Sequence, residues 1–355
     1  MRKRTIKILV PVAVLSAAGI GLVIHSASAE SAQVVHPGES IQKAVDAAQP
    51  GDTVVVQPGT YRESVLVGKA DVTLRGSGSR TVLRPADSGA GASGACAKAG
   101  NGICVQGPAG RTVDGVRIES LTVTGFKKNG VWASGTDRLT VRRVTAEHNG
   151  IWGIAQERST RGAFMDNTAR ANGDAGIFVA NTVDKEGGAT DTLGTEVRGN
   201  TLTDNRIGFT ARRVRNLSVH DNSVTGNCTG VFVVGDEGKP QAGAMTVESN
   251  RITGNNKFCS ATERLSALQG SGIVLTGAAD TKVRSNTIRD NSGATPMSGG
   301  VVLFKSFVGT KNTGNTISGN VVLGNKPADL ANGDTGKGNT FTDNVCAKSA
   351  PAGMC

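Results

Sequence analysis

The sequence has 355 residues, of which 49 are glycine and only 3% are aromatic, and it carries a formal net charge of +10. The low aromatic content and the lack of long helical patterns exclude a helix bundle, and the regularly spaced hydrophobic residues exclude a disordered chain. A basic surface favours contact with anionic polymers, although a charge that only keeps the protein soluble fits the composition equally well.

Residues 1–29 have the features of an export signal. Four basic residues precede an apolar run from Ile8 to Ile24, and the small residues ASA at 27–29 form a cleavage site. The alternative, an uncleaved membrane anchor, needs about 20 apolar residues, more than this run supplies. Cleavage removes four of the 39 basic residues and none of the 29 acidic ones, leaving 35 against 29. We therefore expect a secreted, extracellular protein with no membrane segment after cleavage.

The segment 30–51 contains a short helix that we expect to cap the fold. Within SIQKAVDAAQ (40–49), Ser40 is placed as the N-cap residue. Its apolar residues fall on one face at helical spacing: Ile41, Ala44, Val45 and Ala48. A helix here would cover the first strands against edge-to-edge pairing.

An asparagine-framed phrase recurs in the chain, as GNTLTDN at 199–205, GNTISGN at 314–320 and GNTFTDN at 338–344. Alignment of the phrase gives a series of second asparagines: Asn149, Asn172, Asn205, Asn227, Asn255, Asn291, Asn320 and Asn344. Five residues before them the alignment places Val144, Asn167, Asn200, Asn222, Asn250, Asn286, Asn315 and Asn339. The steps between second asparagines are 23, 33, 22, 28, 36, 29 and 24 residues, as expected for a short repeat that bears loop insertions.

A glycine series accompanies the asparagines: Gly130, Gly153, Gly176, Gly208, Gly230, Gly272 and Gly300. The first and third residues after each glycine are mostly apolar, which is the period of a β-strand with both positions pointing inward. The units are too short for helical crossovers. They predict an all-β solenoid over residues 52–345, in which equivalent strands stack in parallel about 4.8 Å apart. Stacked asparagines would then build the same corner on every turn, a structural role.

Six cysteines occur after the export signal, and an even number in an oxidising compartment favours disulfides. Neighbours in the sequence suggest the pairs Cys96–Cys104, Cys228–Cys259 and Cys346–Cys355, which is one of 15 pairings. The last pair would tie down a tail of residues 346–355. A zinc site is disfavoured because no CxxC spacing occurs.

The segment 39–78, with its PGDTVVV, PGTYRE and VTLRG stretches, resembles the opening of right-handed parallel β-helix proteins of the pectate-lyase superfold. The later N-T-I-x-x-N units resemble the generic repeats of this superfold, including those of periplasmic copper-site maturation proteins. The resemblance spans roughly residues 33–345 and implies a right-handed coil. It implies no single activity, since the scaffold carries lyases, hydrolases, esterases, epimerases and non-catalytic proteins. The QDTL and DFIFG stretches of pectin methylesterases, the DPH triplet of mannuronan epimerases and the Lys–Arg signature of alginate and chondroitin lyases are not found.

Catalysis in this superfold usually occurs on one exposed strand face, and the strands after the ladder glycines are the candidates here. Their outward positions predict an aromatic stripe of Trp132, Phe178 and Phe232, to which Lys305 adds a charge near the same edge. The stripe would be a sugar-stacking platform if it is open. Alternatively, the inserts 181–194, 235–244 and 256–269 fold over it and bury it.

Charged residues at the same face suggest a reaction. Glu157 and Arg158 are placed two turns from Arg212 and Arg213, roughly 10 Å away. β-Elimination of a uronic-acid polymer needs a positive group on the substrate carboxylate and a base for the C5 proton, which these residues could supply. A solvated salt-bridge cluster is the structural alternative.

A second set of acidic residues suggests a metal ion or a different reaction. Asp174, Asp236 and Glu237 are candidate ligands for a Ca²⁺ ion. Hydrolysis would instead need two carboxylates about 5–9.5 Å apart, for which Asp174 and Glu157 form the candidate pair.

These patterns lead to two hypotheses of function. The first is a secreted enzyme that binds and cleaves an acidic polysaccharide, as a lyase or a glycoside hydrolase. The second is a non-catalytic extracellular scaffold or carbohydrate-binding surface protein. In both cases we expect a monomer whose partner is an anionic polysaccharide or another cell-envelope polymer. A nucleic-acid partner is not expected, because the sequence shows no stacked aromatic platform of the kind that binds nucleic acid.

Overall fold

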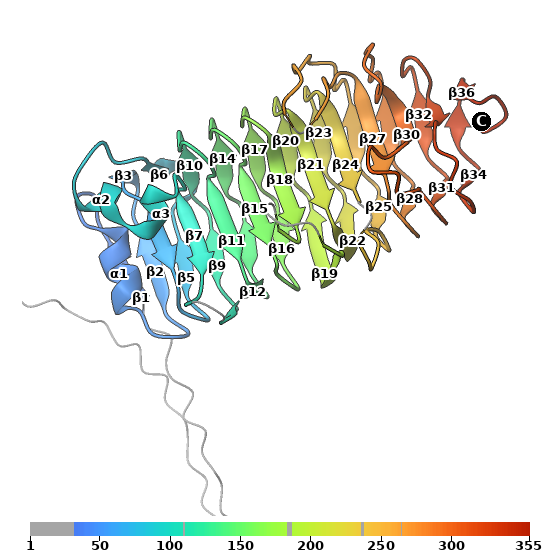
Figure 1. The fold of residues 1–355 in the computed structure, drawn as a ribbon. Helices are drawn as coiled ribbons and strands as arrows, with labels where there is room; N and C mark the ends of the chain where they lie inside the picture. The colour runs from blue at the N-terminus through green and yellow to red at the C-terminus, as the bar shows by residue number, and fades with distance from the viewer. Residues whose placement is uncertain (1–31, 109–110, 183–186, 236–237, 264) are drawn as a thin grey trace, which may run out of the picture.

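The structure is a computed structural model that describes residues 32–108, 111–182, 187–235, 238–263 and 265–355. The expected export signal therefore lies outside the described residues. Within them, three long parallel sheets run along an elongated coil, with the first strands at one end and the C-terminus at the other (Figure 1).

Each turn of the coil contributes one strand to each long sheet. Sheet 1 contains, in spatial order, the 12 described strands β1 (Ala32–Val35), β2 (Thr53–Val56), β5 (Thr73–Arg75), β9 (Arg117–Glu119), β13 (Thr140–Arg142), β16 (Ala163–Met165), β19 (Thr190–Arg198), β22 (Val214–His220), β25 (Thr246–Glu248), β28 (Lys282–Arg284), β31 (Thr316–Ser318) and β34 (Thr340–Thr342). Sheet 2 contains the 11 described strands β3 (Gly59–Arg62), β6 (Thr81–Arg84), β10 (Thr122–Thr124), β14 (Thr145–Glu147), β17 (Thr168–Arg170), β20 (Thr201–Thr203), β23 (Ser223–Thr225), β26 (Arg251–Thr253), β29 (Thr287–Arg289), β32 (Val321–Leu323) and β35 (Val345–Cys346).

Sheet 3 carries the strands that follow the ladder glycines. Its 11 described strands are β4 (Val65–Val67), β7 (Ile103–Gln106), β11 (Val131–Ser134), β15 (Ile154–Glu157), β18 (Ala175–Ala180), β21 (Ile207–Arg212), β24 (Thr229–Val234), β27 (Ser271–Thr276), β30 (Gly299–Phe304), β33 (Leu330–Asn332) and β36 (Ser349–Ala350). The remaining described elements are a small pair, β8 (Val113–Asp114) with β12 (Thr136–Asp137), and the helices α1 (Ile41–Ala47), η1 (Gly78–Arg80), α2 (Ala90–Ser93) and α3 (Ala95–Lys98).

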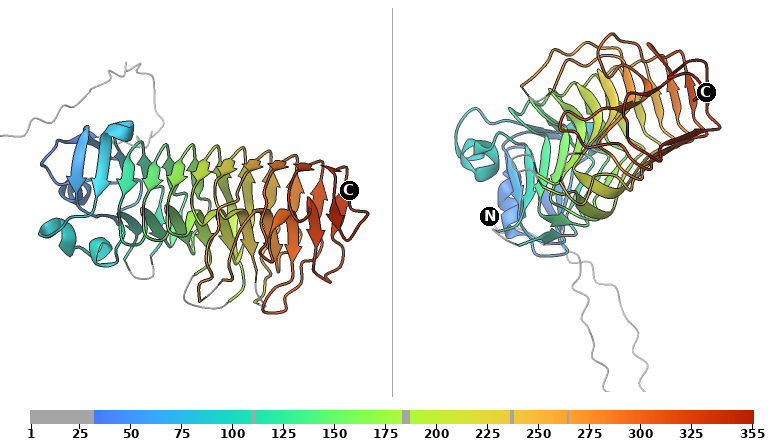
Figure 2. Two further views of the ribbon diagram at one scale, coloured as in Figure 1. Left: turned by 90° about the horizontal axis from the view of Figure 1, so that it is seen from above. Right: turned by 45° about the vertical axis from the view of Figure 1, so that its right-hand side comes forward.

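This arrangement confirms the predicted all-β solenoid, a parallel β-helix. The strands extend slightly beyond the expected range 52–345, because β1 pairs in parallel with β2 and β36 pairs in parallel with β33. From above, the coil is a straight stack from which loops project on one side (Figure 2).

The strand register of sheet 3 follows the glycine series. Ile154 pairs with Val131 and with Ile177, and all three side chains are buried in the single core cluster inside the coil. The glycines themselves are needed because of the stacking: a Cβ atom on Gly153 would lie 2.6 Å from the carbonyl oxygen of Gly176 on the next turn. Only a residue without a side chain lets the backbones approach so closely.

Two ladders of hydrogen-bonded asparagines connect successive turns at the corners on either side of sheet 2. The predicted vertical register of Asn205, Asn227 and Asn255 is confirmed, since the backbone N and Nδ2 of each donate to Oδ1 of the next, at 2.9–3.2 Å. This ladder runs through Asn149, Asn172, Asn205, Asn227, Asn255, Asn291 and Asn325 and ends on Asp329. The other runs through Asn167, Asn200, Asn222, Asn250, Asn286, Asn320 and Asn344.

The sequence alignment was wrong for the last two turns. Asn291 bonds to Asn325 and not to Asn320, and Asn286 bonds to Asn320 and not to Asn315. The reason is that one turn carries two similar corners five residues apart. GNTLTDN contains β20 of sheet 2, whereas GNTISGN contains β31 of sheet 1, so the same phrase builds two different sides of the coil.

The N-terminal end is covered as expected. Ser40 is the N-cap of α1, where Ser40 Oγ accepts a hydrogen bond from Lys43 N at 3.3 Å, and Ile41 and Val45 are buried. The buried Glu63 carboxylate also accepts bonds from Ser40 Oγ, Ile41 N and Gln42 N. At the other end, Cys346 and Cys355 are bonded, and the pairs Cys96–Cys104 and Cys228–Cys259 are confirmed as well.

Candidate functional site

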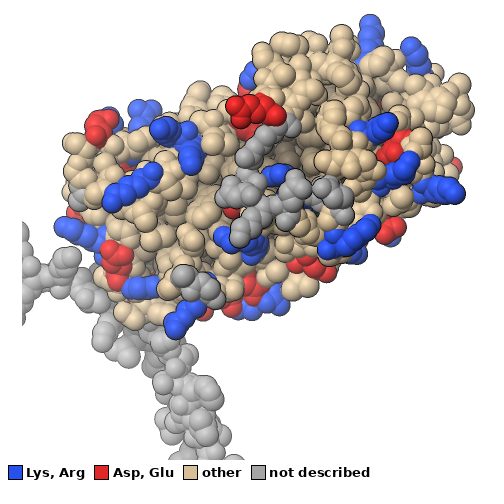
Figure 3. All heavy atoms as spheres, viewed as in Figure 1, with Lys and Arg blue, Asp and Glu red and all other residues tan. Residues whose placement is uncertain are grey.

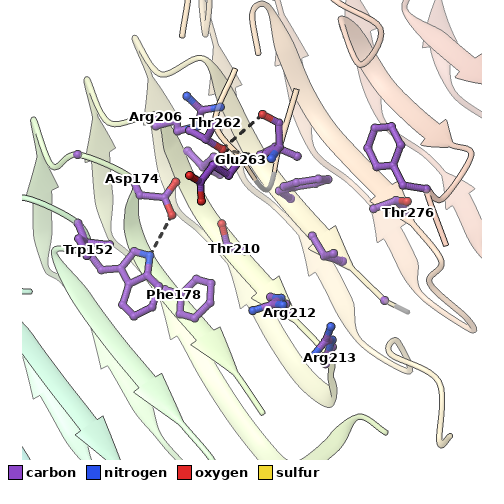
Figure 4. Close-up of a pocket in the computed structure, with 18 of the residues that line it drawn as sticks. Trp152, Asp174, Phe178, Arg206, Thr210, Arg212, Arg213, Thr262, Glu263 and Thr276 are labelled. Atoms are coloured by element: carbon purple, nitrogen blue, oxygen red, sulfur yellow. Dashed lines mark hydrogen bonds between the residues drawn. The ribbon is translucent and has the colours of Figure 1, made fainter. Parts of the chain in front are cut away.

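A pocket of about 660 Å³ lies on the outer face of sheet 3. Its floor is built by side chains of four successive strands, β18, β21, β24 and β27 (Figure 4). The segments 256–269 and 305–310, which are inserted between strands of the coil, form its roof with Thr262, Glu263, Leu265, Phe307 and Val308. The pocket therefore lies where rigid strands and long inserts meet, a usual place for a binding site.

The outward positions of sheet 3 place the predicted stripe as expected from the sequence. Trp132 pairs with Ala155, and Ala155 pairs with Phe178. Phe232 lies two strands beyond Phe178. Phe178 is only 5% exposed and Phe232 only 4%, because they pack in an apolar cluster with Leu268, so the reading in which inserts cover the stripe is correct for them. Both still present part of the ring to the pocket, whereas the partly buried Trp132 is not among the described lining residues.

The aromatic wall of the pocket contains a residue that the sequence reasoning missed. Trp152 stacks on Phe178 with ring centroids 4.1 Å apart and planes 4° from parallel. Its position directly before the ladder Gly153 could have placed it at the start of a strand of sheet 3. Trp152 is 9% exposed and Phe178 5%, so the pair presents only part of its aromatic surface to the pocket, and such a surface suits the apolar face of a sugar ring.

The end of the pocket beside Trp152 is acidic. Trp152 Nε1 donates a hydrogen bond to Asp174 Oδ2 at 3.1 Å. Burial raises the pKa of the Asp174 carboxyl, although the bond from Trp152 and the nearby charge of Arg206 act in the opposite direction. Glu263 extends from the roof toward Asp174, and Thr210 lies on the floor beside them (Figure 4). Thr210 is 5% exposed, and its hydroxyl has no hydrogen-bond partner.

The opposite end of the pocket is basic. Arg212 closes β21, where it pairs with Ala180 and Val234, and Arg213 follows it in a left-handed backbone conformation with φ 53°. Both line the pocket. Figure 3 shows this face of the coil, on which basic side chains gather along the lower rim among acidic ones.

The structure separates residues that the sequence analysis had grouped. Glu157 pairs with Ala180, so it lies two strands from Arg212, as expected. Glu157 and Arg158 are not among the described lining residues, and Arg158 Nη2 donates to Ser134 Oγ at 2.9 Å. The pairing of Asp174 with Glu157 for hydrolysis is wrong. Asp174 precedes β18 while Glu157 is level with its last residue, about 20 Å away at the rise of a strand.

The roof over the acidic end is fastened to the coil. Arg206 Nη1 and Nη2 donate to the carbonyl oxygens of Ser260 and Ser266, at 2.7 and 3.3 Å. Cys259 is bonded to Cys228, the residue before β24, and exchanges backbone hydrogen bonds with Leu268. These contacts fix the segment that carries Glu263.

The remaining predicted site residues are not gathered in the pocket. Lys305 is exposed and does not line it. Asp236 and Glu237 lie outside the described residues. Among the residues that are described, no group of three or more His, Cys, Asp or Glu side chains could hold a metal ion, so Asp174 has no described partners for Ca²⁺.

Comparison with known proteins establishes the class: the chain is a right-handed parallel β-helix. A family model for the right-handed β-helix region matches residues 93–242, and one for the periplasmic copper-binding protein NosD matches residues 183–352. No curated protein matches the sequence.

Solved structures share the fold at low sequence identity. The A-module of a mannuronan C-5 epimerase from Azotobacter vinelandii is 21% identical, with a TM-score of 0.59 over 86% of this chain and 88% of that chain. A DFA-IIIase from Arthrobacter chlorophenolicus without its lid is 15% identical, with a TM-score of 0.58 over 86% and 83%. An alginate lyase from Paenibacillus sp. is 14% identical, with a TM-score of 0.51 over 81% and 94%. At these identities the likeness shows the fold alone.

Within the part of the chain that the structure describes, the side chains do not form a copper site. Copper favours cysteine, methionine and histidine ligands, but all six cysteines are in disulfides and the described residues contain no metal-binding cluster of His, Cys, Asp and Glu. His220 is instead bonded to Asp221 and Glu196. The helices of the described residues are all too short or too polar to cross a membrane.

Proposed function

We propose that the protein binds an acidic polysaccharide in the pocket on the outer face of sheet 3. One observation carries the proposal: the same pocket has a stacked aromatic wall, Trp152 on Phe178, and two arginines at its far end. An aromatic wall suits the apolar face of a sugar ring, and arginines suit its carboxylate. The mannuronan epimerase and the alginate lyase are named for polymers of sugar acids, which supports this substrate class.

The basic end of the pocket would bind the acidic group of the sugar. Arg212 and Arg213 would pair with a uronate carboxylate, which a guanidinium group can bind through two parallel hydrogen bonds. If cleavage occurs by β-elimination, the same arginines would stabilise the charge that develops on that carboxylate.

The cellular location that we propose is outside the cytoplasm. Three disulfides support it, because such bonds persist in oxidising compartments. The expected export signal of residues 1–29 agrees with it. A secreted protein with a mature basic surface would meet anionic cell-envelope or extracellular polymers.

The test is a calorimetric titration with oligosaccharides of pectate, alginate, hyaluronan and chondroitin. At least one acidic oligosaccharide should bind, and Arg212→Ala should weaken it about tenfold or more, the value of a hydrogen bond to a charged group. Arg251→Ala is the matched control, since Arg251 is an exposed arginine of sheet 2 on another side of the coil, and it should bind as the wild type does. No binding of any acidic oligosaccharide would favour the non-catalytic scaffold instead.

A further inference from the structure

We propose that the acidic end of the pocket hydrolyses the bound glycoside, with Asp174 as the general acid and Glu263 as the general base. This inference rests on the proposed function, because it requires a sugar chain in the pocket. It differs from β-elimination in the residues used, in the bond that is broken and in the product.

The first support is placement. Asp174 is held by the coil, directly before β18, whereas Glu263 comes from the roof, and both line one pocket. Figure 4 shows the two carboxyl groups near one another in that view, with Thr210 beside them. Glycoside hydrolysis uses two carboxyl groups that flank the bond to be broken, and these two carboxyl groups line the same pocket.

The second support is the unpartnered Thr210 hydroxyl. Thr210 lies on β21, the second of the four strands of the floor, is 5% exposed, and its Oγ1 atom has no hydrogen-bond partner. A buried polar atom without a partner is costly unless a ligand completes its bonds. In the acidic end of the pocket, a sugar hydroxyl or the attacking water would be such a partner.

The surroundings of the two carboxyl groups divide their tasks. Asp174 lies against the Trp152–Phe178 stack, and burial raises its pKa, which keeps a proton available for the leaving oxygen. The bond from Trp152 Nε1 to Oδ2 fixes the orientation of the carboxyl group. Glu263 is on the exposed roof, where water reaches it, as a general base needs.

The reaction balances with water as its only co-reactant. The Asp174 carboxyl gives its proton to the glycosidic oxygen as the bond from that oxygen to the anomeric carbon breaks. A water molecule attacks the anomeric carbon, and its proton passes to the Glu263 carboxylate. The products are a new reducing end and a free hydroxyl on the leaving sugar, with no double bond formed.

The experiment measures reducing ends and ultraviolet absorbance of unsaturated sugars from the same four polysaccharides. The wild type should release reducing ends without unsaturated product. Asp174→Asn and Glu263→Gln should each slow the reaction about 100-fold or more, as expected for loss of a general acid or base. Glu248→Gln, a carboxylate of sheet 1 that pairs with Arg284, is the control and should keep full activity.

The calorimetric titration distinguishes failure of the hydrolytic assignment from failure of the proposed binding function. In Asp174→Asn and Glu263→Gln the oligosaccharide should still bind with an affinity within a few fold of the wild type, which also shows that the variants are folded. Binding without release of reducing ends, unsaturated products, or full activity in either variant would overturn the hydrolytic assignment and leave the proposed function standing. Absence of binding by the wild type would overturn both.

Discussion

At the residue scale, the buried asparagines add side-chain hydrogen bonds between turns to the backbone hydrogen bonds of the three sheets. Asn250 Oδ1 accepts bonds from both N and Nδ2 of Asn222, at 3.0 and 2.9 Å, and Asn250 in turn donates to Asn286. Removal of one such side chain leaves buried donors without an acceptor. Loss of one ladder asparagine should therefore lower the free energy of unfolding by more than the net contribution of an ordinary hydrogen bond.

We expect Asn250→Ala to lower the free energy of unfolding by about 1–3 kcal/mol, the penalty for an unsatisfied buried group. Denaturant unfolding followed by circular dichroism measures it. Ser223→Ala changes an exposed side chain on the adjacent β23 and should be close to neutral. Equal stability of the two variants would mean that the ladder contributes little.

Asp174 gives a prediction on pH. Burial raises its pKa, so the carboxyl stays protonated to a higher pH than an ordinary aspartate. If it is the general acid, cleavage is retained below this raised pKa and lost as the pH rises through it. A rate profile for Trp152→Phe, which removes a bond that favours the carboxylate, should shift this loss to higher pH. Loss of activity at the same pH as in the wild type, or at a lower pH, would contradict the assignment.

His220 gives a prediction on stability. Burial lowers the pKa of His220, but hydrogen bonds with Asp221 and Glu196 outweigh this and raise it above 6.5. The protonated ring therefore stabilises the fold fully below pH 6.5, and this contribution is lost as the pH rises through the raised folded pKa. Thermal unfolding of His220→Gln should show its largest deficit against the wild type in acid and a smaller one in alkali. A deficit that does not change with pH would contradict this.

At the scale of elements, the roof segment 256–269 is held to the coil by a small number of contacts. Its ties are Arg206, the Cys228–Cys259 bond and the backbone pairing of Cys259 with Leu268. We expect Cys228→Ala/Cys259→Ala to make this segment cleave faster in limited proteolysis and to weaken oligosaccharide binding. Cys96→Ala/Cys104→Ala removes a disulfide near the other end of the coil and should leave both properties as in the wild type. Equal effects of the two pairs would contradict a specific role for the roof.

The strands and the cap helix could be predicted from the sequence more accurately than the contacts between distant segments. The strand period, the ladder glycines and the Ser40 cap depend on local chemistry, and all three were recovered. Two corners five residues apart carry the same phrase, so the alignment slipped from Asn325 to Asn320 where both corners look alike. That Asp174 and Glu263 line one pocket could not be predicted from the sequence, because Glu263 lies on an insert whose path depends on Arg206 and a disulfide.

At the scale of the whole molecule, the coil serves as a rigid frame with one specialised side. Sheet 3 presents seven glycine-led strands, and four of them in succession, β18, β21, β24 and β27, build the floor of the pocket. At the N-terminal end, α1 covers strands that would otherwise pair with further chains, and at the other end a disulfide joins Cys346 to Cys355. The position of the pocket along the coil is then determined by which turns carry long inserts, and the repeat itself does not determine it.

The most direct test is a crystal structure of the protein with an acidic oligosaccharide that binds in solution. The sugar chain should occupy the outer face of sheet 3, with a ring against Trp152 and Phe178 and a carboxylate on Arg212. An oligosaccharide bound on another face of the coil, with this pocket unchanged, would contradict the account.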